Sequence, residues 1–309
     1  MSRTAAVACV TGAGTAPELM AEAVLALDAV GRLHGLQIDD THVSFGGVAL
    51  ARAGQAVPAA TRSAILGADA VLVAGAGEPA LDEVMSELDL RAELTCVRFG
   101  NDGAVAFVTP LEESATEWAI EVAFRIAESR SMRLSAVGDA PWNAVVDEVA
   151  ARHEHVQVEH LAPRVAIPLA AFEAGRFDVV AVAPAWSEPM VEIAAAPSAT
   201  RVAAHGRLSE HGPSLFVPSP DGGFATDGHG VVNPSSMLLA AAMMLEHGLN
   251  APAPAATLAR AVSAALVGGR QTPDLLRFGV GATSREFTSR VVAGFHLALG
   301  NAEFWVGAA

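Results

Sequence analysis

Short apolar segments alternate with longer stretches of helical periodicity along most of this 309-residue chain, and this alternation constrains its fold most strongly. The apolar segments read as buried strands and lie at residues 5–10, 69–75, 132–137, 156–160 and 177–183. The helical stretches lie at residues 18–33, 112–129, 144–153, 165–174, 235–249, 255–269 and 284–299. Strands that alternate with helices of this length predict an α/β fold with an at least partly parallel sheet.

Size and composition indicate a globular protein. At roughly 150 residues per domain, the chain has room for two domains or one large one. An apolar content of 52% with 28 glycines favours a compact fold over disorder. The net charge of −15 argues against nucleic acid or an anionic membrane as partner. All 19 basic residues are arginine, so the chain contains no lysine, and it contains no tyrosine.

Cysteine spacing and the N-terminal sequence indicate the cellular compartment in which the protein is expected. Cys9 and Cys96 fit neither a CxxC pattern nor a Cys/His zinc spacing, which argues against a disulfide framework or a zinc site. The first apolar run is too short for a signal peptide and meets a glycine turn at once. Since no uncharged apolar run reaches about 18 residues, we expect no membrane span and a cytoplasmic protein.

Two glycine-rich stretches are candidate ligand loops. The sequence GAGTAPE (12–18) follows a strand and opens a helix, where backbone N–H groups can hold an anion, but it also suits a plain tight turn. It is no full dinucleotide motif, because Pro17 stands where GxGxxG has its third glycine. The loop at 220–234 carries Asp221, Asp227 and His229, which could bind a ligand or serve as solvated turn residues.

The stretch WSEPMVEIA (186–194) places Glu188 and Glu192 four residues apart, hence on one face of a predicted helix. Two such carboxylates could hold a divalent cation. They could also be an ordinary acidic first turn, with Ser187 as the cap and Pro189 in the first turn. Local sequence leaves both interpretations open.

Longer blocks resemble the isopropylmalate/isocitrate dehydrogenase family over almost the whole chain, and its isopropylmalate branch most closely. TGAGTAPELMAEAVLALDAV looks like the family's GDGIGPE opening and the helix that follows it. Further similar blocks lie at residues 45–79, 88–94, 158–180, 231–249 and 272–288. The resemblance implies a two-domain α/β fold with a shortened second domain, the first domain comprising residues 1–98 and 200–309 and the second, on the dimerisation side, residues 99–199.

The resemblance also implies a homodimer with shared active sites, in which a 2-hydroxy acid is oxidised with NAD(P) and decarboxylated with Mg²⁺ or Mn²⁺. A lysine and a tyrosine normally move the protons, and this chain has neither. Asp139 takes the lysine's place, and the segment that carries the tyrosine is largely missing. Met85 and Thr95 occupy the positions of two substrate arginines, although Arg91 and Arg98 lie nearby and could hold an anion.

The cofactor motifs are similarly altered. Ala13 and Ala16 replace the Asp and Gly of GDGIGPE, and Pro220 and Asp221 replace the start of the family's HGSAP. Only Asn233, with the proline after it, matches the adenine-side pattern. We therefore expect no cofactor, while NAD(P) binding through Asn233 remains an alternative.

At the family's metal site, the resemblance aligns Glu188 and Glu192 with two aspartates on a helix that bind the cation. It aligns Arg164 with the metal ligand that the partner subunit provides. A guanidinium cannot coordinate a cation and would repel it. We therefore expect no Mg²⁺ or Mn²⁺ site, and we hypothesise that Arg164 replaces the cation in an inter-subunit ion pair with Glu188 or Glu192.

Three functions remain open from the sequence. The first is a repurposed, metal-independent enzyme for a small polar or carboxylated molecule in a specialised pathway. Its candidate residues are Asp139, Glu188, Glu192 or a histidine such as His205 for proton transfer, with Arg164, Arg91 and Arg98 for an anion. The second is a catalytically inactive, regulatory or binding dimer. The third is a residual NAD(P)-dependent 2-hydroxy acid dehydrogenase, which fold alone cannot establish.

Overall fold

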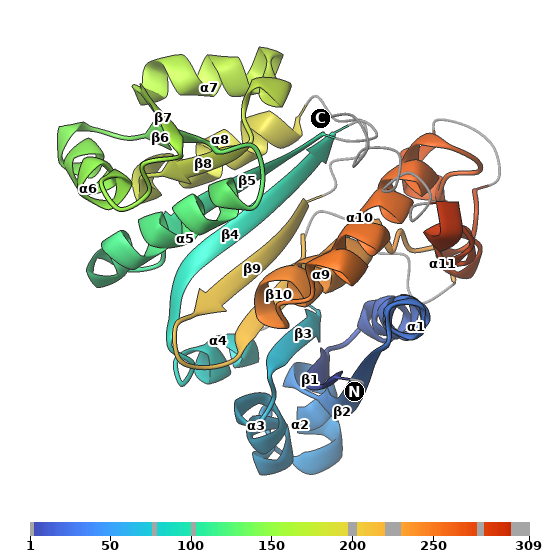
Figure 1. Cartoon of the computed structure of the whole chain (residues 1–309). Helices are drawn as coiled ribbons and strands as arrows, with labels where there is room; N and C mark the ends of the chain where they lie inside the picture. Colours follow the sequence, from blue (N-terminus) through green and yellow to red (C-terminus); the bar gives the residue numbers. More distant parts are fainter. Residues whose placement is uncertain are drawn as a thin grey trace. The chain divides into compact units, whose positions relative to one another are not determined.

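The computed structural model describes residues 3–75, 79–99, 103–196, 203–219, 230–276 and 281–297. The chain forms two compact units: unit 1 comprises Met1–Asp89 and His211–Ala309, and unit 2 comprises Leu90–Glu210. Both units combine strands and helices, which confirms the predicted α/β class (Figure 1). In the described segments, no helix has both the length and the apolar character needed to cross a bilayer.

The strands of unit 1 form a parallel sheet. They are β1 (Arg3–Thr11), β2 (Leu36–Ser44), β3 (Ala70–Ala74) and β10 (Ser214–Pro218), in the order β2-β1-β3-β10. All five residues of β3 are buried, as expected for a central strand of a parallel sheet that is covered on both faces.

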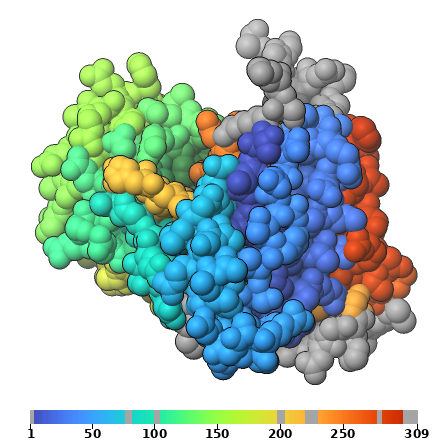
Figure 2. All heavy atoms as spheres, turned by 90° about the horizontal axis from the view of Figure 1, so that it is seen from below, coloured from blue at the N-terminus to red at the C-terminus, as the bar shows by residue number. Residues whose placement is uncertain are grey.

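Helices from both ends of the sequence pack together in unit 1. They are α1 (Ala16–His34), α2 (Gly46–Ala53), α3 (Ala59–Leu66), α4 (Pro79–Met85), α9 (Ser235–Met243), α10 (Pro252–Val267) and α11 (Ser284–Ala293), with a π-helical turn at Met244–Gly248 and a 3-10 turn at Pro273–Leu275. Every residue of α9 is buried, and α1 contacts α9, α10 and α11. Figure 2 shows the N-terminal segment, in blue, beside the orange and red C-terminal helices.

Unit 2 contains a mixed sheet. Its strands are β4 (Leu90–Phe99), β5 (Gly103–Pro110), β6 (Arg133–Val137), β7 (Gln157–Leu161), β8 (Val179–Val182) and β9 (Ala203–Ser209), in the order β9-β4-β5-β8-β6-β7. β4 runs antiparallel to β5 and β9, whereas β5, β8, β6 and β7 are parallel. We call the edge where these four parallel strands end the carboxyl edge. Because β4 is antiparallel to β5, it begins at this edge.

Helices cover the sheet of unit 2 (Figure 1). They are α5 (Thr116–Glu128), α6 (Ala140–Ala150), α7 (Pro163–Phe172) and α8 (Pro184–Ala195), with 3-10 turns at Glu113–Ala115 and Ala174–Arg176. α5 contacts α6, and α7 contacts α8. Ala166 of α7 and Met190 of α8 pack with Val97, Phe107 and Val180 of the sheet in one buried apolar cluster.

Most predicted strands and helices are present, and the differences concern polar strands and helix starts. The five predicted strands correspond to β1, β3, β6, β7 and β8. The pattern missed β2, β4 and β9, whose sequences mix polar and apolar residues instead of forming a short apolar run. It also missed β5, although residues 104–108 form a continuous apolar run. α6 begins at Ala140, four residues before the predicted start, because Asp139 caps it.

Candidate functional site

Four of the sequence-predicted site residues lie at the carboxyl edge of unit 2. Asp139 follows β6, Arg164 follows β7, and Glu188 lies in the helix that follows β8. The parallel register places Val137 beside both Val182 and Leu161, so these three strands end level with one another. Arg91 joins them at the start of β4. In open α/β sheets, ligands bind outside the carboxyl ends of the strands.

Asp139 has a structural role at this edge. Its Oδ1 accepts a hydrogen bond from the backbone N–H of Trp142 at 3.2 Å, which caps the N-terminus of α6. The residue is exposed, so its second carboxylate oxygen can still meet a ligand. The cap alone explains an aspartate at this position.

The structure corrects the local interpretation of Glu188 and Glu192. α8 begins at Pro184 with Ala183 as N-cap, so Ser187 does not cap the helix and Pro189 lies inside it. Neither glutamate therefore lies in the first turn, where the helix dipole would favour an acid. Both are exposed, whereas Met190 and Ala194 are the buried residues of this helix. The two carboxylates share the face opposite those buried residues.

Arg164 lies in the first turn of α7 and is exposed. Within the described part of a single chain, it forms neither a hydrogen bond nor an ion pair through its side chain. A cation in the first turn of a helix is unfavourable with respect to the helix dipole, so the turn itself does not account for an arginine here.

Arg91 and Arg98 do not lie together. Arg91 is at the carboxyl edge, where its Nε lies 3.3 Å from a carboxylate oxygen of Glu210. Arg98 is seven positions further along β4, which at ~3.4 Å per residue is roughly 24 Å away, at the opposite edge. The expectation that both arginines hold one small anion is therefore wrong, because an extended strand separates them. Arg91 shares the carboxyl edge with the other candidates, but β4 is four strands from β7, which at ~4.8 Å per strand puts it roughly 19 Å from Arg164.

The sequence reasoning missed a polar cluster on β4, β5 and β9. His205 Nδ1 lies 3.0 Å from Thr95 Oγ1 and 3.4 Å from Glu93 Oε1. Thr109 lies directly across from Glu93 in the β4–β5 register and is 8% exposed. A hydrogen bond from His205 lowers the pKa of the Glu93 carboxyl, and the charges of His205 and Arg207 lower it further, against the effect of burial. The signal available in the sequence was His205 together with Thr95, but not their pairing across 110 residues.

Asn233, the predicted cofactor-side residue, uses its side chain within unit 1. Its Nδ2 donates to Asp274 Oδ2 at 2.9 Å. Its Oδ1 accepts from the Ser235 backbone N–H at 3.0 Å and from the Ser235 hydroxyl at 2.7 Å. A buried amide with these three bonds joins the start of α9 to the 3-10 turn at Pro273–Leu275. These bonds give Asn233 a structural role and use one of the two N–H donors of its amide.

The other proposed cofactor residues divide between described and undescribed segments. Pro220, Asp221, Asp227 and His229 lie outside the described residues. In the GAG turn, Gly14 has a φ of 64° and the N–H of Gly12 donates to the carbonyl of Ala74 at 2.9 Å. Glu18, in the first turn of α1, accepts a hydrogen bond from the N–H of Gly230 at 3.2 Å. These bonds are those of a structural turn.

Glu188, Glu192 and Arg164 do not form a set of divalent-cation ligands within one chain. Among the described residues of one chain, no third His, Cys, Asp or Glu joins Glu188 and Glu192 in a group of possible ligands. Arg164, the residue that the family resemblance aligns with the third ligand, has no acceptor atom in its guanidinium. A group of three possible ligands does occur in unit 1, at Cys9, Asp40 and His42. There, burial and the charge of Asp40 raise the pKa of the Cys9 thiol to about 12, which keeps it protonated, whereas metals bind the thiolate.

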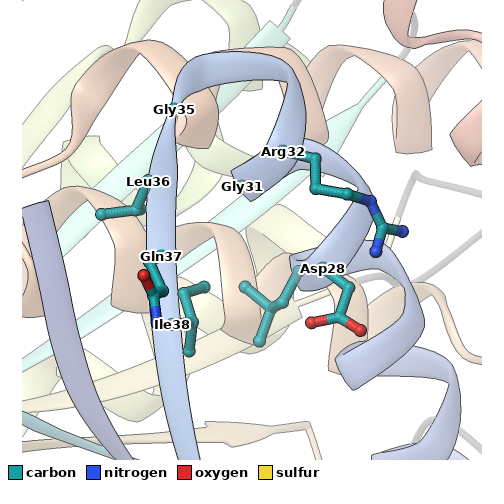
Figure 3. A pocket seen from close by; sticks show the side chains of 8 residues that line it. Asp28, Gly31, Arg32, Gly35, Leu36, Gln37 and Ile38 are labelled. Carbon is teal, nitrogen blue, oxygen red and sulfur yellow. The ribbon is translucent and has the colours of Figure 1, made fainter. Parts of the chain in front are cut away.

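A hollow between α1 and β2 in unit 1 offers no further candidate site (Figure 3). It has a volume of about 270 Å³ and is lined by apolar residues, glycines and the side chains of Asp28, Arg32 and Gln37. Figure 3 shows Asp28 and Arg32 on α1, while Gln37 lies on the neighbouring strand. None of the predicted site residues lines it.

Known proteins match this chain over most of its length. The model of the family described as isocitrate/isopropylmalate dehydrogenase matches residues 97–291. The 3-isopropylmalate dehydrogenase of Bacillus cereus is 28% identical over 349 residues, covering 93% of this chain and 95% of that protein. The protein of the same name from Synechococcus sp. strain CC9902 is 29% identical and covers 87% and 92%. Because 349 aligned residues exceed the 309 of this chain, segments of the Bacillus protein have no counterpart here.

Solved structures share the fold. The beta-decarboxylating dehydrogenase of Thermococcus kodakarensis superimposes with a TM-score of 0.80 at 21% identity, covering 97% of this chain and 99% of that chain. The isocitrate dehydrogenase of Methylococcus capsulatus gives a TM-score of 0.75 at 19% identity, covering 94% and 99%. At these identities, the likeness concerns the fold.

Proposed function

Since the chain belongs to the isocitrate/isopropylmalate dehydrogenase family, we propose that it is a repurposed enzyme of that family. It acts on a small polar or carboxylated metabolite, without Mg²⁺ or Mn²⁺, at the carboxyl edge of unit 2. The observation that supports this proposal is the group of charged side chains there. Asp139, Arg164 and Glu188 are exposed, and Arg91 is half-buried. Arg164 in particular lies in a first helical turn that does not itself favour a cation, so a role toward a ligand or a partner chain would account for it.

The family resemblance implies chemistry that uses a lysine, a tyrosine and a divalent cation. Oxidation of a hydroxyl and loss of carbon dioxide require proton transfer and, in metal-dependent enzymes, a cation that polarises the oxygen. The chain has no lysine and no tyrosine, and Arg164 opposes a cation. Available instead are carboxylates that exchange protons or hold an amine, and arginine side chains that bind an anion. These groups suit acid–base chemistry on a small polar molecule.

The proposal includes a homodimer in which α7 and α8 meet their symmetry mates. α7 exposes 88% of Phe172 and 44% of Val165, and α8 exposes 39% of Trp186. Large apolar side chains on two neighbouring helices favour a protein partner over water. In this dimer, Arg164 of one chain pairs with Glu188 or Glu192 of the other, which places a fixed positive charge where relatives would hold a cation.

A catalytically inactive, regulatory dimer is the second candidate. Two of the predicted site residues have structural roles that need no ligand, since Asp139 caps α6 and Asn233 ties α9 to a neighbouring turn. Under this alternative, α7 and α8 would serve association only, and the charged edge would bind another chain.

A thermal-shift panel on the full chain tests the proposal. It contains NAD, NADP, Mg²⁺, Mn²⁺ and a range of small acids and amines. We expect stabilisation by at least one small acid or amine and none by the metals, since a ligand specific for the folded state raises its stability. Stabilisation by NAD with formation of reduced nicotinamide on adding a hydroxy acid would support the residual dehydrogenase instead. Indifference to every small molecule, with tight binding to another chain, would support the inactive dimer.

A further inference from the structure

The polar cluster of Glu93, Thr95 and His205 is a hydrogen-bonded unit within a single sheet. Thr95 and His205 are partners across β4 and β9, and Glu93 is two residues before Thr95 on the same face. His205 Nδ1 receives both contacts, at 3.0 Å from Thr95 Oγ1 and 3.4 Å from Glu93 Oε1. Thr95 is 4% exposed, so the cluster is anchored in the sheet and is not a loose surface pair.

The partners of Nδ1 determine which ring nitrogen carries the proton. An ionised carboxylate only accepts hydrogen bonds, and the threonine hydroxyl can accept one as well. The proton of a neutral His205 therefore belongs on Nδ1, where it meets both oxygens. The pKa of Glu93 is lowered chiefly by its hydrogen bond with His205, so the carboxylate is ionised at neutral pH. A carboxylate beside Nδ1–H orients the ring and stabilises the imidazolium if Nε2 takes up a proton.

Nε2 is then the nitrogen available to a ligand. It forms no hydrogen bond with any described residue, and the His205 side chain is 21% exposed. The neighbouring Thr109 hydroxyl, on the same face as Glu93, is buried and has no hydrogen-bond partner among the described residues. A buried hydroxyl without a hydrogen bond lowers the stability of the fold unless a ligand or a water molecule forms that bond. Thr109 is also one residue beyond the pairing of Val108 with Ala181, and hence level with the end of β8 at the carboxyl edge.

We infer that His205 is the proton-accepting catalytic residue of this chain for a hydroxyl-bearing small molecule, with Glu93 and Thr95 as its positioning residues. The hydroxyl of the ligand donates to Nε2, and the oxygen can accept from Thr109. Nε2 can take the proton of that hydroxyl, which leaves an alkoxide on the ligand and an imidazolium whose positive charge is balanced by Glu93. The inference rests on the proposed function, because it requires that a small molecule bind at this edge.

A hydroxyl fits this cluster better than a carboxylate does. The ring nitrogen facing the ligand is an acceptor, and the nearest ionised side chain, Glu93, is negative. A carboxylate placed against them would be repelled by Glu93, and Thr109 would offer it a single donor. The acidic part of a carboxylated ligand would have to lie elsewhere at the edge, towards Arg91 at the start of β4.

The free protein tests the hydrogen-bonding arrangement first. Long-range proton–nitrogen NMR on chain labelled with ¹⁵N-histidine distinguishes the two neutral tautomers, and His205→Gln identifies the signal. We expect the Nδ1-protonated form in the wild type, and a shift towards the other tautomer in Glu93→Gln, which can donate to Nδ1. A neutral His205 protonated at Nε2 would overturn the inference, whatever the protein binds.

Matched acids test the role in binding. 4-Hydroxybutyrate and butyrate differ by one hydroxyl at the end of the chain away from the carboxylate, so their thermal shifts report recognition of that group. We expect 4-hydroxybutyrate to stabilise the wild type more, and the preference to fall at least tenfold in apparent affinity in His205→Gln and to persist in His160→Gln, a paired histidine on β7. An unchanged preference in His205→Gln would overturn the inference. A wild type indifferent to both acids overturns the hydroxyl-acid class, and if the whole ligand panel is also silent, it is the proposed function that fails.

Discussion

The carboxylate of Asp139 accepts a hydrogen bond from the backbone N–H of Trp142, with 3.2 Å between Oδ1 and the nitrogen, and thereby caps α6. The same aspartate stands, by family resemblance, at the position of a proton-transferring lysine. One residue thus has a demonstrable structural role and a proposed catalytic one. Substitutions that keep the cap but remove the charge can separate them.

Asp139→Ala should lower the free energy of unfolding by about 1 kcal/mol, because it leaves an N-terminal N–H of α6 without its acceptor. Asp139→Asn should keep most of that stability, since the asparagine oxygen can cap as well. If the charge serves a ligand, Asp139→Asn should still lose the thermal shift produced by the small acid or amine. Urea unfolding of the three proteins, followed by the ligand panel, measures both effects. A ligand response in Asp139→Asn equal to that of the wild type would leave only the capping role.

Asn233→Ala should lower the free energy of unfolding by about 1–3 kcal/mol, because it removes three hydrogen bonds and leaves their buried partner atoms unsatisfied. Ser235→Ala removes only one of these bonds, so a smaller loss is expected and serves as the comparison. Denaturant midpoints report the difference. If Asn233→Ala left stability unchanged but abolished a thermal shift by NAD, the residue would be a cofactor contact and the structural account would be wrong.

The sequence predicted the parallel core of the fold because its strands are continuous apolar runs. Val179 to Val182 is buried at every position, and nothing but a covered strand suits such a run. β4 and β9 escaped prediction because polar residues interrupt their apolar positions, so neither contains a continuous apolar run. The start of α8 was misplaced since Ser187 is a good capping residue by type, whereas the helix begins earlier at Pro184, which is itself well suited to a first turn.

The candidate site could be predicted only as far as single positions allow. Family resemblance identified Asp139, Arg164 and Glu188, and the parallel strand order brings them to one edge. The partnership of Thr95 with His205 depends on an antiparallel register between segments far apart in sequence, which no local pattern encodes. Arg91 and Arg98 show the converse, because closeness in sequence within a strand means separation in space.

His153 should make stability depend on pH. Its ring lies between Glu121 and Glu128, at 2.9 and 2.7 Å, and stacks on Phe124. Burial alone would lower the pKa of His153, but hydrogen bonds to the two carboxylates outweigh this and raise it. A raised pKa stabilises the fold fully below the unfolded value of ~6.5, and this contribution is lost as pH rises through the folded value.

The pKa of Glu121 is lowered, because hydrogen bonds from Arg152 and His153 outweigh the opposing effect of burial. Its contribution is present above the unfolded value of 4.5 and is lost on acidification. The stability advantage of the wild type over His153→Gln should therefore be largest between about pH 4.5 and 6.5 and shrink towards pH 8.5. Urea unfolding across this range tests it, with the exposed His155→Gln as control. An advantage that grew with pH would contradict the sign.

Phe172→Asp should dissociate the proposed dimer. The side chain is 88% exposed in one chain, and a symmetric interface would bury it twice. Burying a phenylalanine contributes about 1.5–3 kcal/mol, so two copies imply a dissociation constant raised at least roughly a hundredfold. Sedimentation velocity over a concentration series measures this.

Leu50→Asp alters another exposed apolar residue, in unit 1, and should leave the dimer intact. A wild-type chain that sediments as a monomer at all concentrations would remove the dimer, and with it the inter-subunit ion pair.

Arg164→Asp should create a metal site that the wild type lacks. The substitution removes the cation that would repel a metal ion and, in the dimer, adds a third carboxylate to Glu188 and Glu192. Oxygen ligands suit Mn²⁺ and Mg²⁺, which need a negatively charged set to offset their desolvation. We expect no thermal shift of the wild type with Mn²⁺, and a saturable one in the variant, worth about 2.7 kcal/mol at a hundred times its dissociation constant.

Arg133→Asp makes the same charge change at an exposed position on β6, at the opposite edge, and should not respond. Adding Glu188→Gln to Arg164→Asp should abolish the gain. Saturable Mn²⁺ binding by the wild type, lost on Glu188→Gln, would mean that the glutamates hold a metal beside Arg164 and that the charge-replacement hypothesis is wrong.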